Sequence, residues 1–300
     1  MHDIDLLFKG LPGAASAFLF ETEEGPILVE SGPLSTLETL QEGLKQHGVD
    51  PTSICHVFLT HIHLDHAGAA GWFASNGAMI HVHPKGARHL VDPSRLNASA
   101  HMIYGEKMAE LLGEMHAAPE DRVNAVQDGE SIQVGEYTFT AIETPGHASH
   151  HHCWATDLDG ERICFTGDIA GMRLPCSDCV TLPLAPPELD PEAWHRSIDR
   201  IDDGDFDALI LTHSGRVDKV DGHLLRLHEQ LDIEVDLLRI LVENESLDDD
   251  KRLEAYLLAI QEDAIKRSAD TEIVTEHIGM GHAIMNLMGV QRLLGQRLGQ

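Results

Sequence analysis

Four side chains that can bind a metal ion lie within the stretch Thr60-His61-Ile62-His63-Leu64-Asp65-His66. The stretch follows an apolar run, residues 54–60, that predicts a buried strand. Since side chains alternate along a strand, the strand end places His61 and His63 on one side. A tight turn into a helix can direct Asp65 and His66 to a neighbouring position. Because imidazole and carboxylate groups suit zinc, and also iron or manganese, the spacing predicts a centre able to serve two metals.

Three further candidate ligands also follow apolar runs: His147 in Thr-Pro-Gly-His, Asp168 in Phe-Thr-Gly-Asp, and His213 in Ile-Leu-Thr-His. The loops beyond the strands of α/β proteins are where such proteins build their sites. Taken singly, a Gly-Asp pair is often a turn, and a histidine at a strand end is often a surface residue. All three in this order, after the first cluster, predict one extended ligand set.

This constellation resembles the metallo-β-lactamase superfamily over about residues 10 to 215. The resemblance implies an α/β protein built as a four-layer αββα sandwich, with the site at one edge between its two sheets. It also implies two divalent ions, with zinc as the first expectation and iron or manganese as alternatives. The ligand sets implied are His61, His63 and His147 for one metal, and Asp65, His66 and His213 for the other, with Asp168 bridging both. Glu30 stands where many members have an aspartate beneath the metal loop, and is expected to orient a ligand.

The elements expected to position these residues alternate between strand and helix patterns in the first part of the chain. Helices are predicted at 34–47, between 85 and 116, and at 191–201. Strands are predicted at 14–20, 26–30, 54–60, 79–82, 137–142, 152–156, 162–166 and 206–211. The proline-rich stretch 182–190 predicts irregular structure.

Beyond about Val220 the apolar residues keep a spacing of three to four, which predicts helices and no further strands. We therefore predict a metallo-β-lactamase-fold catalytic domain over residues 1–219 and a C-terminal helical cap over residues 220–300. The acidic run Asp248-Asp249-Asp250 is interpreted as a helix start, because the helix dipole favours negative charge there.

The implied chemistry is hydrolysis by a hydroxide that bridges two metals, because a bound metal lowers the pKa of water from about 15.7 to about 7. Asp65 and Asp168 are the expected catalytic carboxylates: Asp65 can take the proton of the nucleophile, and Asp168 holds the two metals at their separation. The predicted enzyme is a binuclear metal-dependent hydrolase of a small ester, thioester or lactone. Two alternatives stay open, an iron-dependent persulfide dioxygenase and a metal-dependent phosphodiesterase.

The charge of the chain limits its partners. With 21 Lys plus Arg against 50 Asp plus Glu, the formal net charge is −29, and no basic run is present. Such a surface repels a phosphate backbone, so a small-molecule substrate is expected and nucleic acid is not. The N-terminus lacks an apolar stretch of signal-peptide length, and no long uncharged apolar run occurs, so we expect a cytoplasmic protein with no membrane partner. A homodimer stays open.

Candidate substrate contacts are few. One residue of the run His150-His151-His152, taken as His151, is expected to face the substrate, and a solvent-exposed turn is the alternative. Arg173 is the basic candidate for a substrate carboxylate or for a structural ion pair. Cys176 and Cys179 have the spacing of half a zinc ribbon but lack a second pair, so their roles stay open.

Overall fold

The computed structural model describes residues 1–175, 177–267 and 270–298. The chain divides into two compact units. Unit 1 consists of Met1–Glu143, His150–Gly167 and Phe206–Arg216. Unit 2 consists of Thr144–Ser149, Asp168–Asp205 and the chain from Val217 onwards.

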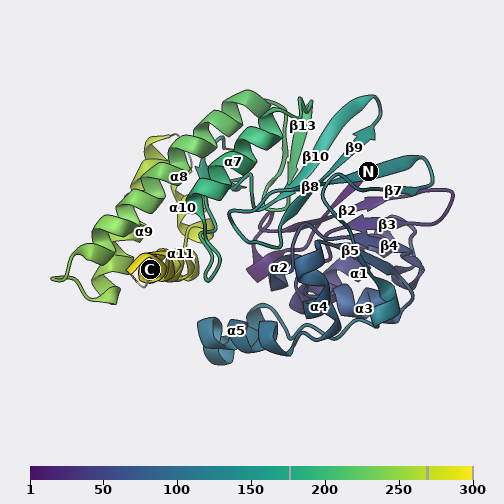
Figure 1. Cartoon of the computed structure of the whole chain (residues 1–300), viewed down its shortest axis with the longest axis horizontal. Coiled ribbons are helices and arrows are strands. Elements are labelled where there is room, and N and C mark those ends of the chain that lie inside the picture. The colour runs from purple at the N-terminus through teal and green to yellow at the C-terminus, as the bar shows by residue number, and fades with distance from the viewer. Residues whose placement is uncertain (176, 268–269, 299–300) are drawn as a thin grey trace. The chain divides into compact units, whose positions relative to one another are not determined.

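Unit 1 contains two mixed six-stranded sheets (Figure 1). The first has the strand order β1-β2-β3-β4-β5-β6, with parallel pairing from β3 to β6. Its strands are β1 (His2–Asp5), β2 (Ser16–Phe20), β3 (Ile27–Val29), β4 (His56–Phe58), β5 (Met79–Val82) and β6 (Val123–Ala125). The second has the order β14-β13-β10-β9-β8-β7, with β10 and β13 parallel. Its strands are β7 (Ser131–Val134), β8 (Tyr137–Glu143), β9 (His152–Leu158), β10 (Glu161–Gly167), β13 (Ala208–Leu211) and β14 (Gly215–Val217).

An aromatic core joins the facing sides of the two sheets. Phe18, Phe20 and Phe58 from the first sheet pack with Phe139 and Phe165 from the second, and all five are buried. The rings of Phe58 and Phe139 are stacked with their centroids 4.4 Å apart. Each such side chain removes a large apolar area from water, so this layer anchors the strand ends from which the site is built.

The opposite face of the first sheet is covered by helices. On α1 (Leu37–Gln46), Leu37, Leu40 and Leu44 recur at helical spacing and pack into the same core cluster as Leu28 and Val57 of the sheet. The other helices of unit 1 are α2 (Leu64–Ala67), α3 (Ala70–Ser75), α4 (Pro84–Val91), α5 (Ser94–Tyr104) and α6 (Met108–Leu111). Short 3-10 helices are η1 (Phe8–Gly10), η2 (Leu34–Thr36), η3 (Pro51–Ser53), η4 (Gly105–Lys107) and η5 (Glu120–Arg122).

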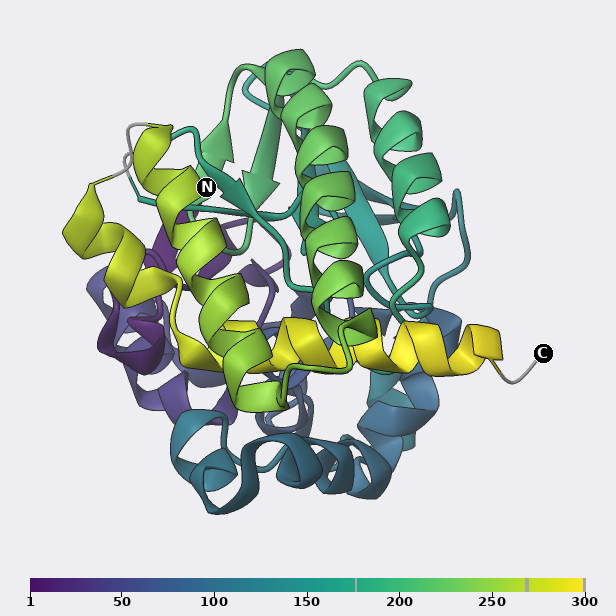
Figure 2. The same cartoon turned by 90° about the vertical axis from the view of Figure 1, so that its left-hand side faces the viewer.

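Unit 2 is mainly helical. Its elements are the hairpin strands β11 (Met172–Arg173) and β12 (Val180–Thr181), and the helices α7 (Pro191–Asp202), α8 (Val220–Glu243), α9 (Asp249–Lys266), α10 (Thr271–His277) and α11 (Met280–Leu298). Figure 2 shows α11, in yellow, crossing α8 and α9, and all three helices contact one another. Asp248 caps α9 by accepting a hydrogen bond from the Lys251 amide, so the acidic run is a helix start as predicted.

The structure agrees with most elements predicted from the sequence. β5 has the predicted bounds, α7 is one residue longer than predicted, and over the described residues beyond Val220 only helices occur. The patterns missed β1, β6, β7 and β14, whose short sequences HDID, VNA, SIQV and GRV contain no continuous apolar run. They also missed the hairpin of β11 and β12. The boundary between residues 219 and 220 stays a prediction, because the two units divide the chain in several places.

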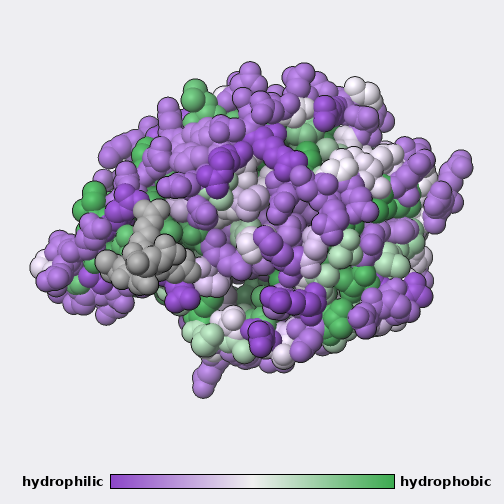
Figure 3. All heavy atoms as spheres, in the orientation of Figure 1, coloured by the Kyte–Doolittle hydropathy of each residue, from purple (hydrophilic) through white to green (hydrophobic). Residues whose placement is uncertain are grey.

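The exposed side chains are mostly polar. Figure 3 shows hydrophilic residues over most of the visible face, in keeping with a formal net charge of −29. Among the residues that the structure describes, none of the helices is both long and apolar enough to cross a bilayer.

Candidate metal centre

The loop that follows β4 carries the first four candidate ligands in unit 1. The chain leaves the strand at Phe58 and enters α2 at Leu64, so the two histidines of the strand end and the two ligands of the helix start lie on one tight turn. The ring of His61 lies 4.6 Å from that of His63 and 4.1 Å from that of His66, measured between centroids. His61 and His66 are buried, whereas His63 and Asp65 are partly exposed.

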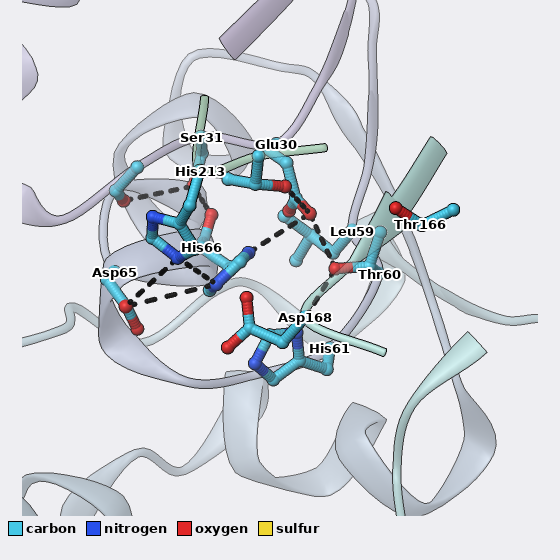
Figure 4. A network of polar contacts seen from close by, with 12 residues as sticks. Glu30, Ser31, Leu59, Thr60, His61, Asp65, His66, Thr166, Asp168 and His213 are labelled. Carbon is cyan, nitrogen blue, oxygen red and sulfur yellow. Dashed lines mark hydrogen bonds and ion pairs between the residues drawn. The ribbon is translucent and has the colours of Figure 1, made fainter. Parts of the chain in front are cut away.

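His213, which follows β13, completes a set of three with Asp65 and His66. One ligand atom from each lies within 4.8 Å of the others. The Nε2 atoms of His66 and His213 are 3.3 Å apart, and the Asp65 Oδ2 atom lies 3.9 Å from the first and 3.7 Å from the second. Figure 4 shows the two rings turned toward each other beside Asp65.

The hydrogen bonds made at Nδ1 of His66 and His213 decide which nitrogen of each ring carries a proton. His213 Nδ1 lies 2.5 Å from the carbonyl oxygen of Ala14, and His66 Nδ1 lies 3.2 Å from Glu30 Oε1. Both oxygens are acceptors, so each Nδ1 is the donor and each neutral ring presents a lone pair at Nε2. Two lone pairs and a carboxylate then face one point, an arrangement that a divalent cation fits.

Glu30 orients two ligands at once. The Thr60 hydroxyl donates to Glu30 Oε1 at 2.5 Å, so the same hydroxyl oxygen accepts from His61 Nδ1 at 3.1 Å. Glu30 is fully buried between His66 and Thr60 (Figure 4), and the same Oε1 also accepts from Thr212 Oγ1 at 3.2 Å. One carboxylate therefore fixes His66 directly and His61 through Thr60, which leaves the Nε2 atom of each as the nitrogen that could bind a metal.

Unit 2 carries the other two candidate ligands, His147 and Asp168, both buried. His147 Nδ1 donates to the carbonyl oxygen of Pro183 at 2.8 Å, which again leaves a lone pair at Nε2. That Nε2 lies 3.3 Å from Asp168 Oδ2. The pair is thus a nitrogen donor and a carboxylate turned toward each other, which suits a metal ion as the ligands of unit 1 do.

Helices α7 and α8 hold the loops that carry this pair. Trp194 Nε1 donates to the carbonyl of Ile169 at 2.7 Å, and His223 Nε2 donates to that of Ala170 at 2.8 Å, directly after Asp168. Burial lowers the pKa of His223 to about 4, so it acts as a neutral donor. Before His147, Gly146 packs so closely that a Cβ there would lie 2.4 Å from the Cα of Trp194. Sequence reasoning missed Trp194 and His223, because no local pattern marks a residue that supports a loop far along the chain.

The histidine run after His147 has three different environments. His151 is fully buried, with its ring 5.0 Å from that of His61, and the partly exposed His150 lies 5.4 Å from the ring of His63. His152 donates to the Leu59 carbonyl at 3.0 Å, and burial lowers its pKa to about 3, so its role is structural. A substrate contact by His151 stays a prediction.

The other sequence candidates lie on the β11–β12 hairpin of unit 2. The Arg173 guanidinium donates to the Ser177 carbonyl at 2.7 Å and pairs with Asp178 at 2.5 Å, so it has a structural role within the hairpin. Its predicted contact with a substrate carboxylate stays a prediction. Cys179 is buried, and burial raises its thiol pKa to about 11. Cys176 lies outside the described residues.

A family model described as the metallo-β-lactamase superfamily matches residues 10–213, which include every candidate ligand. The chain belongs to this superfamily. The resemblance drawn from the ligand pattern is therefore confirmed, as is the expected α/β metallo-β-lactamase fold with a C-terminal helical extension.

Two similar proteins and one solved structure illustrate the likeness. A metallo-β-lactamase fold-containing protein of Sulfurisphaera tokodaii is 28% identical over 190 residues, which cover 61% of this chain and 70% of that protein. An atrochrysone carboxyl ACP thioesterase of Pseudocercospora fijiensis is 32% identical over 132 residues, covering 44% of this chain but only 29% of the thioesterase. The crystal structure of an archaeal superfamily protein from Sulfolobus tokodaii has a TM-score of 0.65 at 21% identity, with 97% of each chain covered, and shares the fold.

Proposed function

We propose that this protein is a metal-dependent hydrolase that cleaves a small ester, thioester or lactone. The observation that carries the proposal is the set Asp65, His66 and His213, in which hydrogen bonds to Glu30 and Ala14 turn both imidazole lone pairs toward a carboxylate. With both histidines buried, such an arrangement is costly without a cation, because like partial charges face each other in a medium of low dielectric constant.

The proposal assigns the remaining candidates to the same centre, following the order of ligands along the chain in the superfamily. His61, His63 and His147 are proposed to hold one divalent ion, and Asp168 to bridge it to the ion of the first set. Nitrogen and carboxylate donors favour zinc, and iron and manganese suit the same atoms. The buried His147 and Asp168 pair of unit 2 supports this assignment by its donor chemistry.

The residues of the chain divide the chemical work. Divalent metal ions, when bound, supply an acidified water as nucleophile and polarise the substrate carbonyl. Asp65 is proposed as the proton acceptor, since its side chain is 28% exposed while the neighbouring His66 is fully buried. Glu30, and the backbone carbonyls of Ala14 and Pro183, keep the protons of the ligand imidazoles at Nδ1.

A small acyl compound fits the chain better than a polyanion does. The formal net charge of −29 repels nucleic acid at long range. Cleaving a phosphodiester usually requires cationic side chains around the phosphate, whereas a neutral or singly charged acyl compound requires the metals and a pocket. The thioesterase among the similar proteins supports the same class of substrate.

The test begins with metal quantification by mass spectrometry on protein purified without chelator. Metal-loaded protein is then assayed with thioesters, lactones and aryl esters, and in parallel with bis(p-nitrophenyl) phosphate and single-stranded RNA. We expect two equivalents of divalent metal and turnover of at least one acyl class. Phosphodiester turnover more than about tenfold above every carbonyl substrate, about 1.4 kcal/mol of transition-state preference, would replace the proposal with the phosphodiesterase alternative. One iron per chain with oxygen uptake on a persulfide would replace it with the dioxygenase.

A further inference from the structure

The candidate ligand His147 depends on a short extended segment of unit 2, Thr181 to Leu184, because its Nδ1 proton is donated to the Pro183 carbonyl. The side-chain amide of Asn286, on α11, holds this segment on both sides of the proline. Asn286 Oδ1 accepts from the Leu184 amide at 2.8 Å, and Asn286 Nδ2 donates to the Leu182 carbonyl at 2.7 Å. Asn286 is completely buried, so water does not compete for these two bonds.

The orientation of the Asn286 amide is itself determined by a buried network. The Tyr256 hydroxyl, on α9, donates to Glu234 Oε2 on α8 at 2.5 Å, so its oxygen accepts the other Nδ2 proton of Asn286 at 2.7 Å. Glu234 Oε1 also accepts from Gln230 at 3.0 Å and from Thr181 Oγ1 at 3.3 Å. Side chains of helices α8, α9 and α11 are therefore all connected by hydrogen bonds to the segment that contains Pro183.

A second contact fixes α11 against the same segment independently of the amide. A Cβ atom on Gly289 would lie only 1.9 Å from the carbonyl oxygen of Leu184. The helix backbone thus lies directly on the segment, and no side chain larger than hydrogen fits at this position without displacing it. A glycine inside a helix is less stable than an alanine, and this close approach to the Leu184 carbonyl is the physical reason for a glycine here.

We propose that Asn286 is a positioning residue for His147, and that α11 thereby sets the affinity of the metal site to which His147 contributes. The inference rests on the assignment of His147 as a ligand under the proposed function. When the Pro183 carbonyl is correctly placed, the imidazole keeps its proton at Nδ1 and its lone pair at Nε2. When the segment shifts, the ring loses this restraint, and the tautomer with a proton on Nε2, which has no lone pair at that atom for a metal, becomes accessible.

Two variants of the full chain perturb the segment in different ways. Asn286→Asp keeps the shape of the side chain but sets an oxygen against the Leu182 carbonyl, which replaces a hydrogen bond with a repulsion. Gly289→Ala displaces the Leu184 carbonyl and leaves the polar network chemically intact. Val290→Ala is the matched control, because Val290 is fully buried on the same helix and its side chain has no hydrogen-bonding group.

The measurements are zinc affinity by competition with a chromophoric chelator, the absorption spectrum of the cobalt-substituted protein, and the unfolding midpoint without metal. We expect Asn286→Asp and Gly289→Ala to weaken one zinc equivalent by about tenfold or more and to change the cobalt spectrum. Val290→Ala should lower the unfolding midpoint and leave both metal readouts as in the wild type.

Three outcomes count against the inference. Unchanged zinc affinity in both Asn286→Asp and Gly289→Ala would overturn it while leaving the proposed function intact. An equal loss in Val290→Ala would overturn it as well, since the effect would then follow general stability. A wild-type chain that binds no zinc, iron or manganese would contradict the proposed function itself, which separates that failure from the other two.

Discussion

The ligands of unit 1 and those of unit 2 are supported in different ways. In unit 1, four candidate ligands lie in one continuous turn after β4, and a single buried carboxylate, Glu30, orients two of them. In unit 2, His147 and Asp168 lie on separate loops and depend on backbone carbonyls held in place by α7, α8 and α11. A side-chain carboxylate therefore orients His61 and His66 of unit 1, where His213 uses the carbonyl of Ala14, and the packing of distant helices positions the pair of unit 2.

This difference determines how each unit responds to substitution. A change at Glu30 alters directly the acceptor that the imidazole of His66 uses. A change in the helices of unit 2 moves a carbonyl that the ligand loop or His147 uses, and acts on the metal only through that movement. The effects should accordingly be large and direct in unit 1, and smaller and indirect for the supports of unit 2.

The largest effect is expected from removal of a ligand in either unit. His61→Ala and His147→Ala should each lose metal and lower kcat/KM by about 10³-fold or more, about 4 kcal/mol of transition-state stabilisation. His101→Ala is the control, because His101 is exposed on α5 and pairs only with Glu114 among the interactions described. Metal content and kcat/KM are measured on the same preparations. Full activity in chelator-stripped wild type would refute the metal mechanism.

The next largest effect is expected from Glu30 and Asn286, the residues that orient candidate ligands in the two units. Glu30→Gln replaces the carboxylate that accepts hydrogen bonds from both His66 and Thr60, so we expect roughly 10- to 100-fold weaker metal binding. This loss of affinity should be at least as large as the loss in Asn286→Asp. Competition with a chelator, measured on both variants, gives the ratio of their metal affinities. A Glu30→Gln chain with wild-type affinity, beside a weakened Asn286→Asp chain, would reverse the comparison between the two units.

A pH-dependent effect is expected from Glu234 in unit 2. Burial raises its pKa from 4.5 to about 7. Below the unfolded pKa the carboxyl is protonated in both states, so its stability contribution is fully present there. As pH rises toward the folded pKa, the unfolded state loses its proton first, and folding is destabilised by up to about 3 kcal/mol.

Glu234→Gln should abolish this component of the pH dependence. The variant should therefore gain stability relative to the wild type between about pH 5 and about pH 8, as measured by urea unfolding at each pH. Subtracting the wild-type stability from that of the variant at each pH cancels the contribution of His152 and His223. These buried neutral histidines are present in both proteins and change stability with pH in the opposite direction. Parallel stability curves for the two chains would show that Glu234 is ionised in the folded state throughout.

The smallest effect is expected at Arg173. Its partner Asp178 is largely exposed, so Arg173→Ala should cost less than about 1 kcal/mol of stability. The Michaelis constants of neutral esters should not change. A Michaelis constant that rises only for substrates bearing a carboxylate would establish the predicted binding role, and unchanged constants for every accepted substrate would remove it.

The sequence predicted the elements whose patterns are long or sharply bounded. The strand at 79–82 was predicted because an apolar run marks it locally, and the helix starting at Pro191 because proline suits the first turn of a helix. The short strands β1 and β6 were missed, because neither contains an apolar run and pairing with a neighbouring strand decides their structure.

The sequence alone determined which residue types are available as ligands, and the strand–turn–helix spacing that brings His61 to His66 together. The proton positions on those ligands were decided only by the tertiary structure, since Ala14, Glu30 and Pro183 reach His213, His66 and His147 from distant parts of the chain. Hydrogen bonds are short and directional, so a sequence pattern cannot reveal which distant oxygen meets a given nitrogen. For the same reason, Asn286 and Gly289 had no visible role in the sequence, and their contacts with the Pro183 segment exist only once α11 has packed.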